Sequence, residues 1–300
     1  MHVQVCVAAA GLWTSPQAAR QLDELVLGHP ADLSAWAAAQ GPAERRQLWG
    51  RLDTQVLLGE TVIVDQIDDG WARVIVPDQP SRRDHRGYPG YLPLAQLAEA
   101  ATPTGERVVV TVPVTEVLAG PGGAVLIPDV SYATVLPSFL REAGGVWVAL
   151  PGGGRGWLPD AAVAPYAEGG PLPTAKELLG EGRQFLGLMY LAGGLASGSG
   201  LDCSGLIHAL YRRFGLVVPR DAADMAGVGD EVPLEKLAPG DLMFFRKPDT
   251  GFVYHVGICA EVIDGWPSML QASQTDWDTI DTPITELRHG HLHSARRLRS

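Results

Sequence analysis

Residues 201–206 of the 300-residue chain read LDCSGL, and they follow the glycine-rich run GGLASGSG. The next residues have helical spacing and share one apolar face: Leu206, Ile207, Leu210 and Phe214. Gly215 is a typical C-terminal stop for such a helix. After residue 240 the strand-like segments GDLMFF, YHVGICAEVI and SMLQAS follow. Helices first and strands later predict an α+β domain, with Cys203 where a loop becomes a helix.

The position of Cys203 has two interpretations. A helix start supplies unpaired N–H groups and the positive end of the helix dipole, which lower a thiol pKa from about 8.5. The glycines before it allow the backbone and a substrate to approach closely. Free cysteine is also among the most buried residue types. The stretch alone therefore leaves a catalytic nucleophile and a buried structural thiol equally open.

A catalytic thiol needs a base within hydrogen-bond reach, and His255 is the candidate. It interrupts an apolar strand and shares one face with Gly257, which is expected to leave space beside the imidazole. Asp264 and Gly265 signal a hairpin turn, close to the position that pairs Gln271 with His255. The Gln271 amide oxygen is then placed to orient the ring. The alternatives are that His255 is a structural histidine of the strand and that Gln271 is an ordinary polar strand residue.

The first half of the chain predicts two small β-barrels. IDDGWARVIVP…GYLPLAQL and EAGGVWVALP…GWLPDAAV repeat one order of glycine turn, Trp-containing strand and Leu-Pro. A hairpin is expected at Asp69-Gly70. Several short strands at this spacing predict barrels rather than βαβ units, and they resemble bacterial SH3 domains.

Short helices are expected before the first barrel, at residues 34–40 with Ser34 as N-cap and at residues 42–49 with Pro42 in the first turn. The segment EGGPLPT, residues 168–174, predicts a linker. The expected domains are 1–103 (N-terminal segment plus first SH3-like barrel), 104–168 (second SH3-like barrel) and 169–300 (α+β domain).

Composition excludes several classes of function. The net charge of -11 and the pI near 5.1 argue against a nucleic-acid surface. Cys6, Cys203 and Cys259 are too far apart for a disulfide framework or a zinc motif. The HxHxH run at residues 289–293 is interpreted as surface, and no metal is expected.

No stretch reaches the roughly 20 apolar residues of a membrane span. The N-terminal residues lack a basic region and a long apolar run, so we expect a cytoplasmic protein. Secretion or attachment to the cell envelope is the alternative.

Four motifs in order carry a resemblance to a known family: DCSG at the helix start, PRDA at 219–222, LAPGDLMFF at 237–245 and HVGI at 255–258. They resemble the NlpC family of papain-like cysteine peptidases, which cut bacterial cell-wall peptides. TQVLLGE, DGWARVIVPDQP and GYPGYLP in the first barrel are similar to the γ-D-glutamyl-L-diamino acid endopeptidases of murein-peptide recycling. The resemblance implies Cys203 as nucleophile, His255 as base and no cofactor. The third catalytic residue of the family is usually histidine. Gln271 stands at that position in this sequence, and it keeps a hydrogen-bond acceptor but carries no charge.

The resemblance also implies a set of oxyanion and substrate contacts: Tyr190, Asp202, Ser204, Arg220, Asp221, Tyr88 and Asp53. Arg220 and Asp221 suit the carboxylate and the ammonium of a zwitterionic peptide, with a structural ion pair as the alternative. Tyr88 and Asp53 are expected to recognise a free L-Ala amine. The alternatives are that Tyr88 is an aromatic residue of the barrel core and that Asp53 is a solvated side chain. Ala192 stands where relatives carry a tryptophan after Tyr190.

The expected activity is cleavage after D-glutamate in L-Ala-γ-D-Glu-diamino acid peptides, through an acyl-enzyme on Cys203. Lysine and diaminopimelate are both open as the diamino acid. The alternatives are an N-acetylmuramoyl-L-alanine amidase, a non-catalytic cell-wall-binding protein and an acyltransferase.

Overall fold

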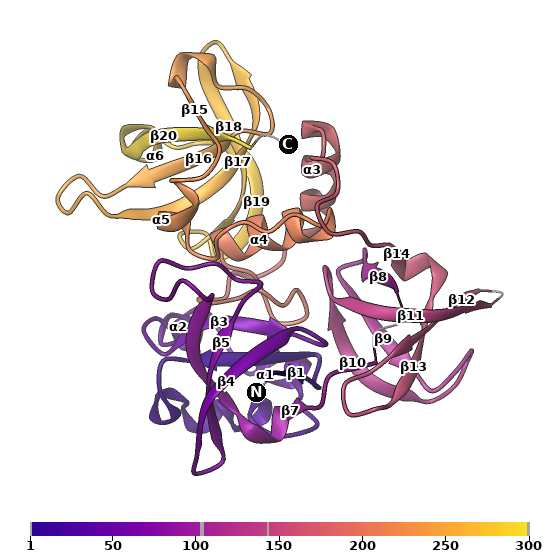
Figure 1. The fold of residues 1–300 in the computed structure, drawn as a ribbon. Coiled ribbons are helices and arrows are strands. Elements are labelled where there is room, and N and C mark those ends of the chain that lie inside the picture. Colours follow the sequence, from indigo (N-terminus) through magenta and orange to yellow (C-terminus); the bar gives the residue numbers. More distant parts are fainter. Residues whose placement is uncertain (1, 103–104, 143, 299–300) are drawn as a thin grey trace.

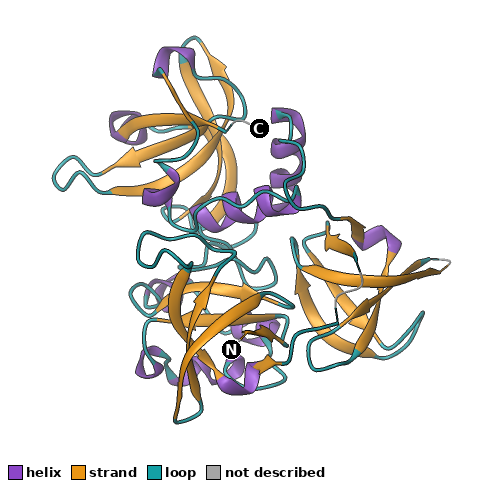
Figure 2. Ribbon diagram, viewed as in Figure 1, coloured by secondary structure: helices purple, strands orange, loops and turns teal. Residues whose placement is uncertain are grey.

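The computed structural model describes residues 2–102, 105–142 and 144–298. Its named strands form three sheets, of seven, seven and six strands (Figure 1). Figure 2 shows that the two N-terminal domains are mostly strands and that the longer helices belong to the C-terminal domain. The expected order of two β domains followed by one α+β domain is confirmed.

The first sheet has the strand order β3-β2-β6-β5-β4-β1-β7, with antiparallel neighbours. Its strands are β1 (His2–Val5), β2 (Ala9–Trp13), β3 (Leu52–Leu57), β4 (Thr61–Asp68), β5 (Trp71–Val76), β6 (Tyr88–Pro93) and β7 (Leu97–Ala98), with η3 (Leu94–Gln96) before β7. The predicted hairpin joins β4 to β5 through Asp69 and Gly70, whose φ angles are 42° and 76°. Two positive φ values are what a tight two-residue hairpin turn requires.

A helical segment separates β2 from β3. It contains η1 (Pro16–Ala18), η2 (Gln21–Val26), α1 (Leu33–Ala38) and α2 (Pro42–Arg46). Pro42 begins α2 as expected. Ser34 as N-cap is wrong: Asp32 caps α1, since its carboxylate accepts from the Ala35 N–H at 2.8 Å. The Ser34 hydroxyl instead donates to Asp129 of the second domain at 2.6 Å.

The second sheet repeats the first, because its order β10-β9-β13-β12-β11-β8-β14 adds seven to each number of the first order. Its strands are β8 (Glu106–Val110), β9 (Val114–Leu118), β10 (Val125–Ser131), β11 (Val135–Glu142), β12 (Gly145–Ala149), β13 (Arg155–Pro159) and β14 (Val163–Pro165), with η4 (Asp160–Ala162) before β14. The shared topology confirms the predicted repeat. Small antiparallel domains of this kind are consistent with SH3-like barrels.

The third sheet has the order β15-β20-β16-β17-β18-β19. Its strands are β15 (Asp230–Val232), β16 (Leu242–Arg246), β17 (Val253–Ile263), β18 (Trp266–Ser273), β19 (Asp278–Pro283) and β20 (Leu292–Arg297). The helices of this domain are α3 (Ala175–Gly182), η5 (Arg183–Phe185), α4 (Cys203–Arg213), α5 (Ala222–Met225), η6 (Leu234–Lys236) and α6 (Glu286–His291).

Helix α4 packs its predicted apolar face on strands β17 and β18. Leu206, Ile207 and Leu210 are fully buried, and Gly215 has the positive φ of 77° expected just past the helix end. One cluster of buried apolar residues extends through all three domains. Burial of apolar surface therefore holds the domains together around the start of α4. Within the described ranges, no helix is long and apolar enough to span a bilayer.

Candidate active site

Cys203 is the first residue of α4, as the sequence predicts. The Asp202 carboxylate caps the helix by accepting from the Gly205 N–H at 2.6 Å. A Cβ at position 205 would lie 2.0 Å from the Gly194 carbonyl oxygen, so only glycine fits there. The thiol also accepts from the Val256 N–H, beside His255. The loop, the helix start and strand β17 thus meet at the sulfur atom.

The thiol pKa differs from the sequence-based expectation. Burial raises the pKa of Cys203 to about 12, and the Asp202 charge raises it further. The N–H groups at the helix start act in the expected direction but are outweighed, because removal from water penalises the thiolate. Burial therefore opposes the lowering of the thiol pKa that the helix start predicts.

His255 and Gln271 form the expected pair. The His255 Nε2 lies 2.6 Å from the Gln271 Oε1. An amide oxygen only accepts, so Nε2 carries the proton and Nδ1 carries the lone pair. Within the described part of the chain Nδ1 is buried and has no hydrogen-bond partner. Burial lowers the pKa of His255 to about 3, so the ring is neutral and can accept a proton at Nδ1.

The register that brings these two residues together is not the one predicted. Ile258 pairs with Leu270, so Gln271 lies one position beyond that pair and reaches His255 diagonally. The offset arises because the turn lies at Asp264 and Gly265 rather than at residue 263, and an irregularity in the pairing after Cys259 recovers only one position of it. The space expected at Gly257 is used by Met269: a Cβ at 257 would lie 2.3 Å from its sulfur.

A cleft of about 410 Å³ opens beside the thiol, between the first β domain and the α+β domain. Its lining includes seven residues singled out from the sequence: Cys203, Tyr190, Asp202, Ser204, Asp221, Tyr88 and Asp53. His255 and Gln271 are not among the lining residues and are 0% and 5% exposed. A larger cavity of about 620 Å³ at the junction of the three domains contains none of these residues.

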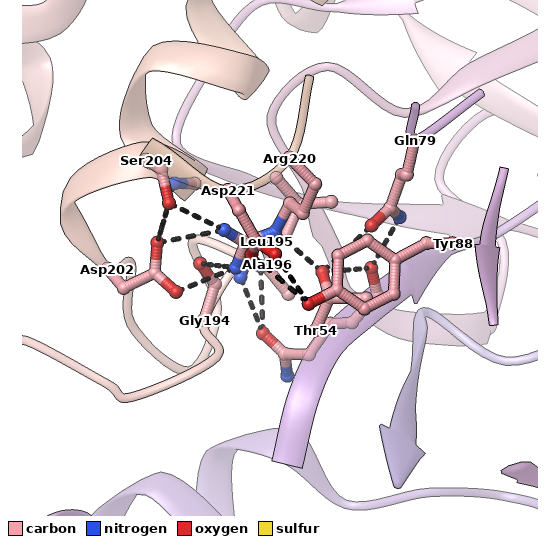
Figure 3. A network of polar contacts seen from close by, with 12 residues as sticks. Thr54, Gln79, Tyr88, Gly194, Leu195, Ala196, Asp202, Ser204, Arg220 and Asp221 are labelled. Carbon is pink, nitrogen blue, oxygen red and sulfur yellow. Dashed lines mark hydrogen bonds and ion pairs between the residues drawn. The ribbon is translucent and has the colours of Figure 1, made fainter. Parts of the chain in front are cut away.

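Arg220 is not in the lining of the cleft and joins the two domains through its hydrogen bonds (Figure 3). Its five N–H groups donate to Thr54 Oγ1, both Asp202 carboxylate oxygens, Ser204 Oγ and the Gly194 carbonyl, at 2.6–3.2 Å. The side chain is 1% exposed. No donor is left for a substrate carboxylate, so the geometry favours the structural ion pair.

In the lining of the cleft, the Tyr88 hydroxyl donates to both oxygens of Asp221 at 3.1 Å (Figure 3). Burial raises the pKa of both side chains. Tyr88 is therefore a buried aromatic of the first domain whose polar end faces the cleft. Asp53 pairs with Arg83 at 2.9 Å, and the Arg83 guanidinium lies over the Tyr88 ring.

Sequence reasoning missed two tryptophans near Tyr190, of which Trp49 lines the cleft. Trp277, in the connection between β18 and β19, packs edge-on against Tyr190 with ring centroids 5.9 Å apart. Trp49 of the first domain lies 6.2 Å from Trp277. The Tyr190 N–H donates to the Trp277 carbonyl at 3.1 Å. No local sequence signal links these residues, because they come from distant parts of the chain.

Comparison with known proteins agrees with this geometry. Residues 187–297 match the NlpC/P60 family. The chain is 36% identical to a Bacillus cereus protein named gamma-D-glutamyl-L-lysine dipeptidyl-peptidase, over 84% of this chain and 78% of that one. A Bacillus subtilis protein of the same name is 37% identical, over 86% of each chain. The chain belongs to the NlpC/P60 family.

A crystal structure of an NlpC/P60 family protein from Bacillus cereus has the same architecture throughout. It matches with a TM-score of 0.90 and 32% identity, over 99% of both chains. Both β domains and the NlpC/P60 domain are therefore arranged alike in the two proteins.

Proposed function

We propose that this protein is a cysteine peptidase that hydrolyses the γ-D-glutamyl bond to a diamino acid in murein peptides with a free N-terminal L-alanine. Two relatives that align over most of the chain carry the name of such a peptidase. The structural observation that supports the proposal best is the cleft beside Cys203, whose lining includes the hydrogen-bonded pair Tyr88 and Asp221.

Cys203 acts as the nucleophile and His255 as the base in this proposal. The thiol proton moves to His255 Nδ1 as sulfur attacks the γ-carbonyl carbon of D-glutamate. Gln271 holds the opposite nitrogen, which keeps Nδ1 directed to the thiol side. The oxyanion accepts from the Cys203 N–H at the helix start and from the Tyr190 hydroxyl.

The intermediate then collapses to a thioester. His255 returns its proton to the diamino acid nitrogen, so the leaving group departs as a neutral amine. Water next attacks the thioester carbon while Nδ1 accepts one of its protons. That proton returns to the sulfur as L-Ala-D-Glu leaves, and the enzyme is regenerated.

The pair of Tyr88 and Asp221 sets the substrate length. Asp221 offers a carboxylate to an ammonium group, and the Tyr88 hydroxyl fixes its orientation. An acetylated amine has no charge and adds bulk beside this pair. Such a site selects short peptides over intact cell wall, which suits action in the cytoplasm on imported fragments.

The test is mass spectrometry of the products from L-Ala-γ-D-Glu-L-Lys and its meso-diaminopimelate analogue. We expect release of L-Ala-D-Glu by the wild type, none by Cys203→Ala, and unchanged release by Cys259→Ala. Cys259 is a matched control because it is also buried but lies outside the cleft. Release by Cys203→Ala would refute the mechanism. Cleavage of a muramoyl-linked peptide while the free tripeptides survive would indicate an amidase.

A further inference from the structure

One segment of the first β domain holds the main chain of Tyr190, whose hydroxyl is the proposed oxyanion donor. Arg45, in α2, is 3% exposed, and its Nη1 reaches the catalytic domain. This nitrogen donates to the Tyr190 carbonyl at 3.2 Å and to the Ser199 carbonyl at 2.9 Å. The other two nitrogens donate to the Gln40 and Ala37 carbonyls of the same segment. Tyr190 is therefore fixed to the helical segment that separates β2 from β3.

The same segment also reaches the side chain of Tyr190. Trp49 follows α2 and lines the cleft together with Tyr190 and Cys203. The Trp49 indole N–H donates to the Tyr190 hydroxyl. Trp277 supports both rings, since it lies 6.2 Å from Trp49 and packs edge-on against Tyr190 at 5.9 Å. Tyr190 is thus held at its carbonyl, at its ring and at its hydroxyl.

The direction of the hydrogen bond from Trp49 decides what the Tyr190 hydroxyl can do. An indole nitrogen only donates, so the phenol oxygen accepts from Trp49 and its own proton is left for another acceptor. Burial raises the pKa of Tyr190, and the ionisable groups of Cys203 and Asp202 raise it further, against the opposite effect of the Trp49 donor. The hydroxyl therefore keeps its proton. A phenol that already accepts one hydrogen bond donates a stronger one, as an oxyanion requires.

We propose that Trp49 is a positioning residue for the reaction, because its indole N–H directs the proton of the Tyr190 hydroxyl to the oxyanion. Trp49 acts through Tyr190 and needs no contact of its own with the reacting atoms. The inference rests on the proposed peptidase function. It gives the first β domain a part in the chemical step, in addition to its part in amine binding.

The test is a double-mutant cycle on the full chain, measured as kcat and KM for L-Ala-γ-D-Glu-L-Lys. Trp49→Phe keeps an aromatic ring and removes the N–H donor, Tyr190→Phe removes the hydroxyl, and a third protein carries both changes. Trp266→Phe is the matched control. Trp266 is 38% exposed against 48% for Trp49, and its indole N–H also donates, to the Ile284 carbonyl at 2.8 Å. It is not among the residues that line the cleft.

We expect Trp49→Phe to lower kcat about tenfold with little change in KM, because an oxyanion contact acts in the transition state. Tyr190→Phe should lower kcat about a hundredfold, the usual effect of losing one oxyanion donor. Adding Trp49→Phe to Tyr190→Phe should lower kcat by no more than about twofold further, since the hydroxyl is already absent. Trp266→Phe should keep the wild-type kcat.

Four results would overturn the proposal. They are a wild-type kcat in Trp49→Phe, a wild-type kcat in Tyr190→Phe, a rise in KM alone, and an equal loss of kcat with and without the Tyr190 hydroxyl. A rise in KM alone would make Trp49 a substrate contact. The equal loss is what a purely structural role predicts, because misfolded protein lowers kcat in both backgrounds. Failure of the wild type to cleave the peptide would instead refute the peptidase function itself.

Discussion

The two β domains have one topology but different relations to the active site. The first supplies seven residues to the lining of the cleft: Trp49, Gly50, Leu52, Asp53, Arg82, Arg83 and Tyr88. None of the described residues of the second domain lines it. A shared strand order therefore does not determine whether a domain takes part in the site.

Part of the difference comes from what is inserted between equivalent strands. In the first domain residues 14–51 separate β2 from β3, and this segment contains α2, Arg46 and Trp49. In the second domain only residues 119–124 separate β9 from β10. The long connection extends from the sheet to the nucleophile loop, where the Arg45 guanidinium donates to the Tyr190 and Ser199 carbonyls. The insertion, rather than the barrel, carries this contact.

The contacts to the catalytic domain also differ in kind. The first domain uses a buried polar network, in which Gln55 accepts from the Leu195 and Ala196 N–H groups at 2.9 Å. The second uses fewer polar contacts, such as Tyr132, whose hydroxyl donates to Glu181 and whose ring packs on Phe185. Changes at the first interface should therefore affect catalysis, and changes at the second should affect mainly stability.

Arg220→Leu should have the largest effect. Removing one partner of a buried ion pair costs about 3–5 kcal/mol, because Asp202 is left buried and unpaired. Urea unfolding should show this loss, and kcat/KM should fall because Asp202 caps α4. Arg155→Leu in the second domain should change stability by less than about 0.5 kcal/mol. Similar stabilities of the two variants would contradict the asymmetry of the domains.

Gln55→Leu should have the second-largest effect on stability and activity. It leaves the N–H groups of Leu195 and Ala196 buried without their acceptor, at a cost of about 2–3 kcal/mol in unfolding free energy. Since these residues lie in the loop before Cys203, activity should fall as well. A Gln55→Leu protein with wild-type kcat/KM would show that the interface does not position the nucleophile loop.

Tyr88→Phe should shift the pH dependence of the free-amine substrate. Burial raises the pKa of Asp221, and the Tyr88 hydrogen bond opposes that rise. Without this bond the pKa rises further, so protonation should abolish ammonium binding at a higher pH. The acid limb of kcat/KM should move up by roughly one unit or less. His255 protonates only near pH 3, below this limb. An unchanged limb would remove Asp221 from amine binding.

Tyr132→Phe should have the smallest effect. It removes one hydrogen bond to Glu181, which keeps the amide of Gln184 as a donor at 2.8 Å. Thermal unfolding should show a loss of about 1 kcal/mol. Activity should stay at the wild-type level, because Tyr132 lies outside the cleft. A drop in kcat/KM would show that the second domain acts on the site.

Sequence reasoning succeeded where a local signal specifies the structure. The Asp69-Gly70 and Asp264-Gly265 turns, the start of α4 and the repeat of the β unit were all predicted from such signals. The hydrogen bond between His255 and Gln271 was also predicted, although from a register that differs from the observed one because the turn lies at Asp264 and Gly265. Short-range sequence patterns do not specify a strand register to within one or two residues.

Features that depend on distant segments were missed. Strands β1 and β2 are short and pair with strands far along the chain, so residues 1–50 gave no barrel pattern. The contact between Trp49 and Trp277 joins the first domain to the loop after β18. The occupied donors of Arg220 likewise depend on Thr54 from another domain.

The central claim is that the first β domain, through Tyr88, helps Asp221 to bind the free amine of the substrate. The direct measurement is kcat/KM for L-Ala-γ-D-Glu-L-Lys against its N-acetylated form, with the wild type and with Asp221→Asn. The account predicts a preference of about a hundredfold or more for the free amine in the wild type, reduced to within about tenfold by Asp221→Asn. Equal cleavage of the two peptides by the wild type would contradict it.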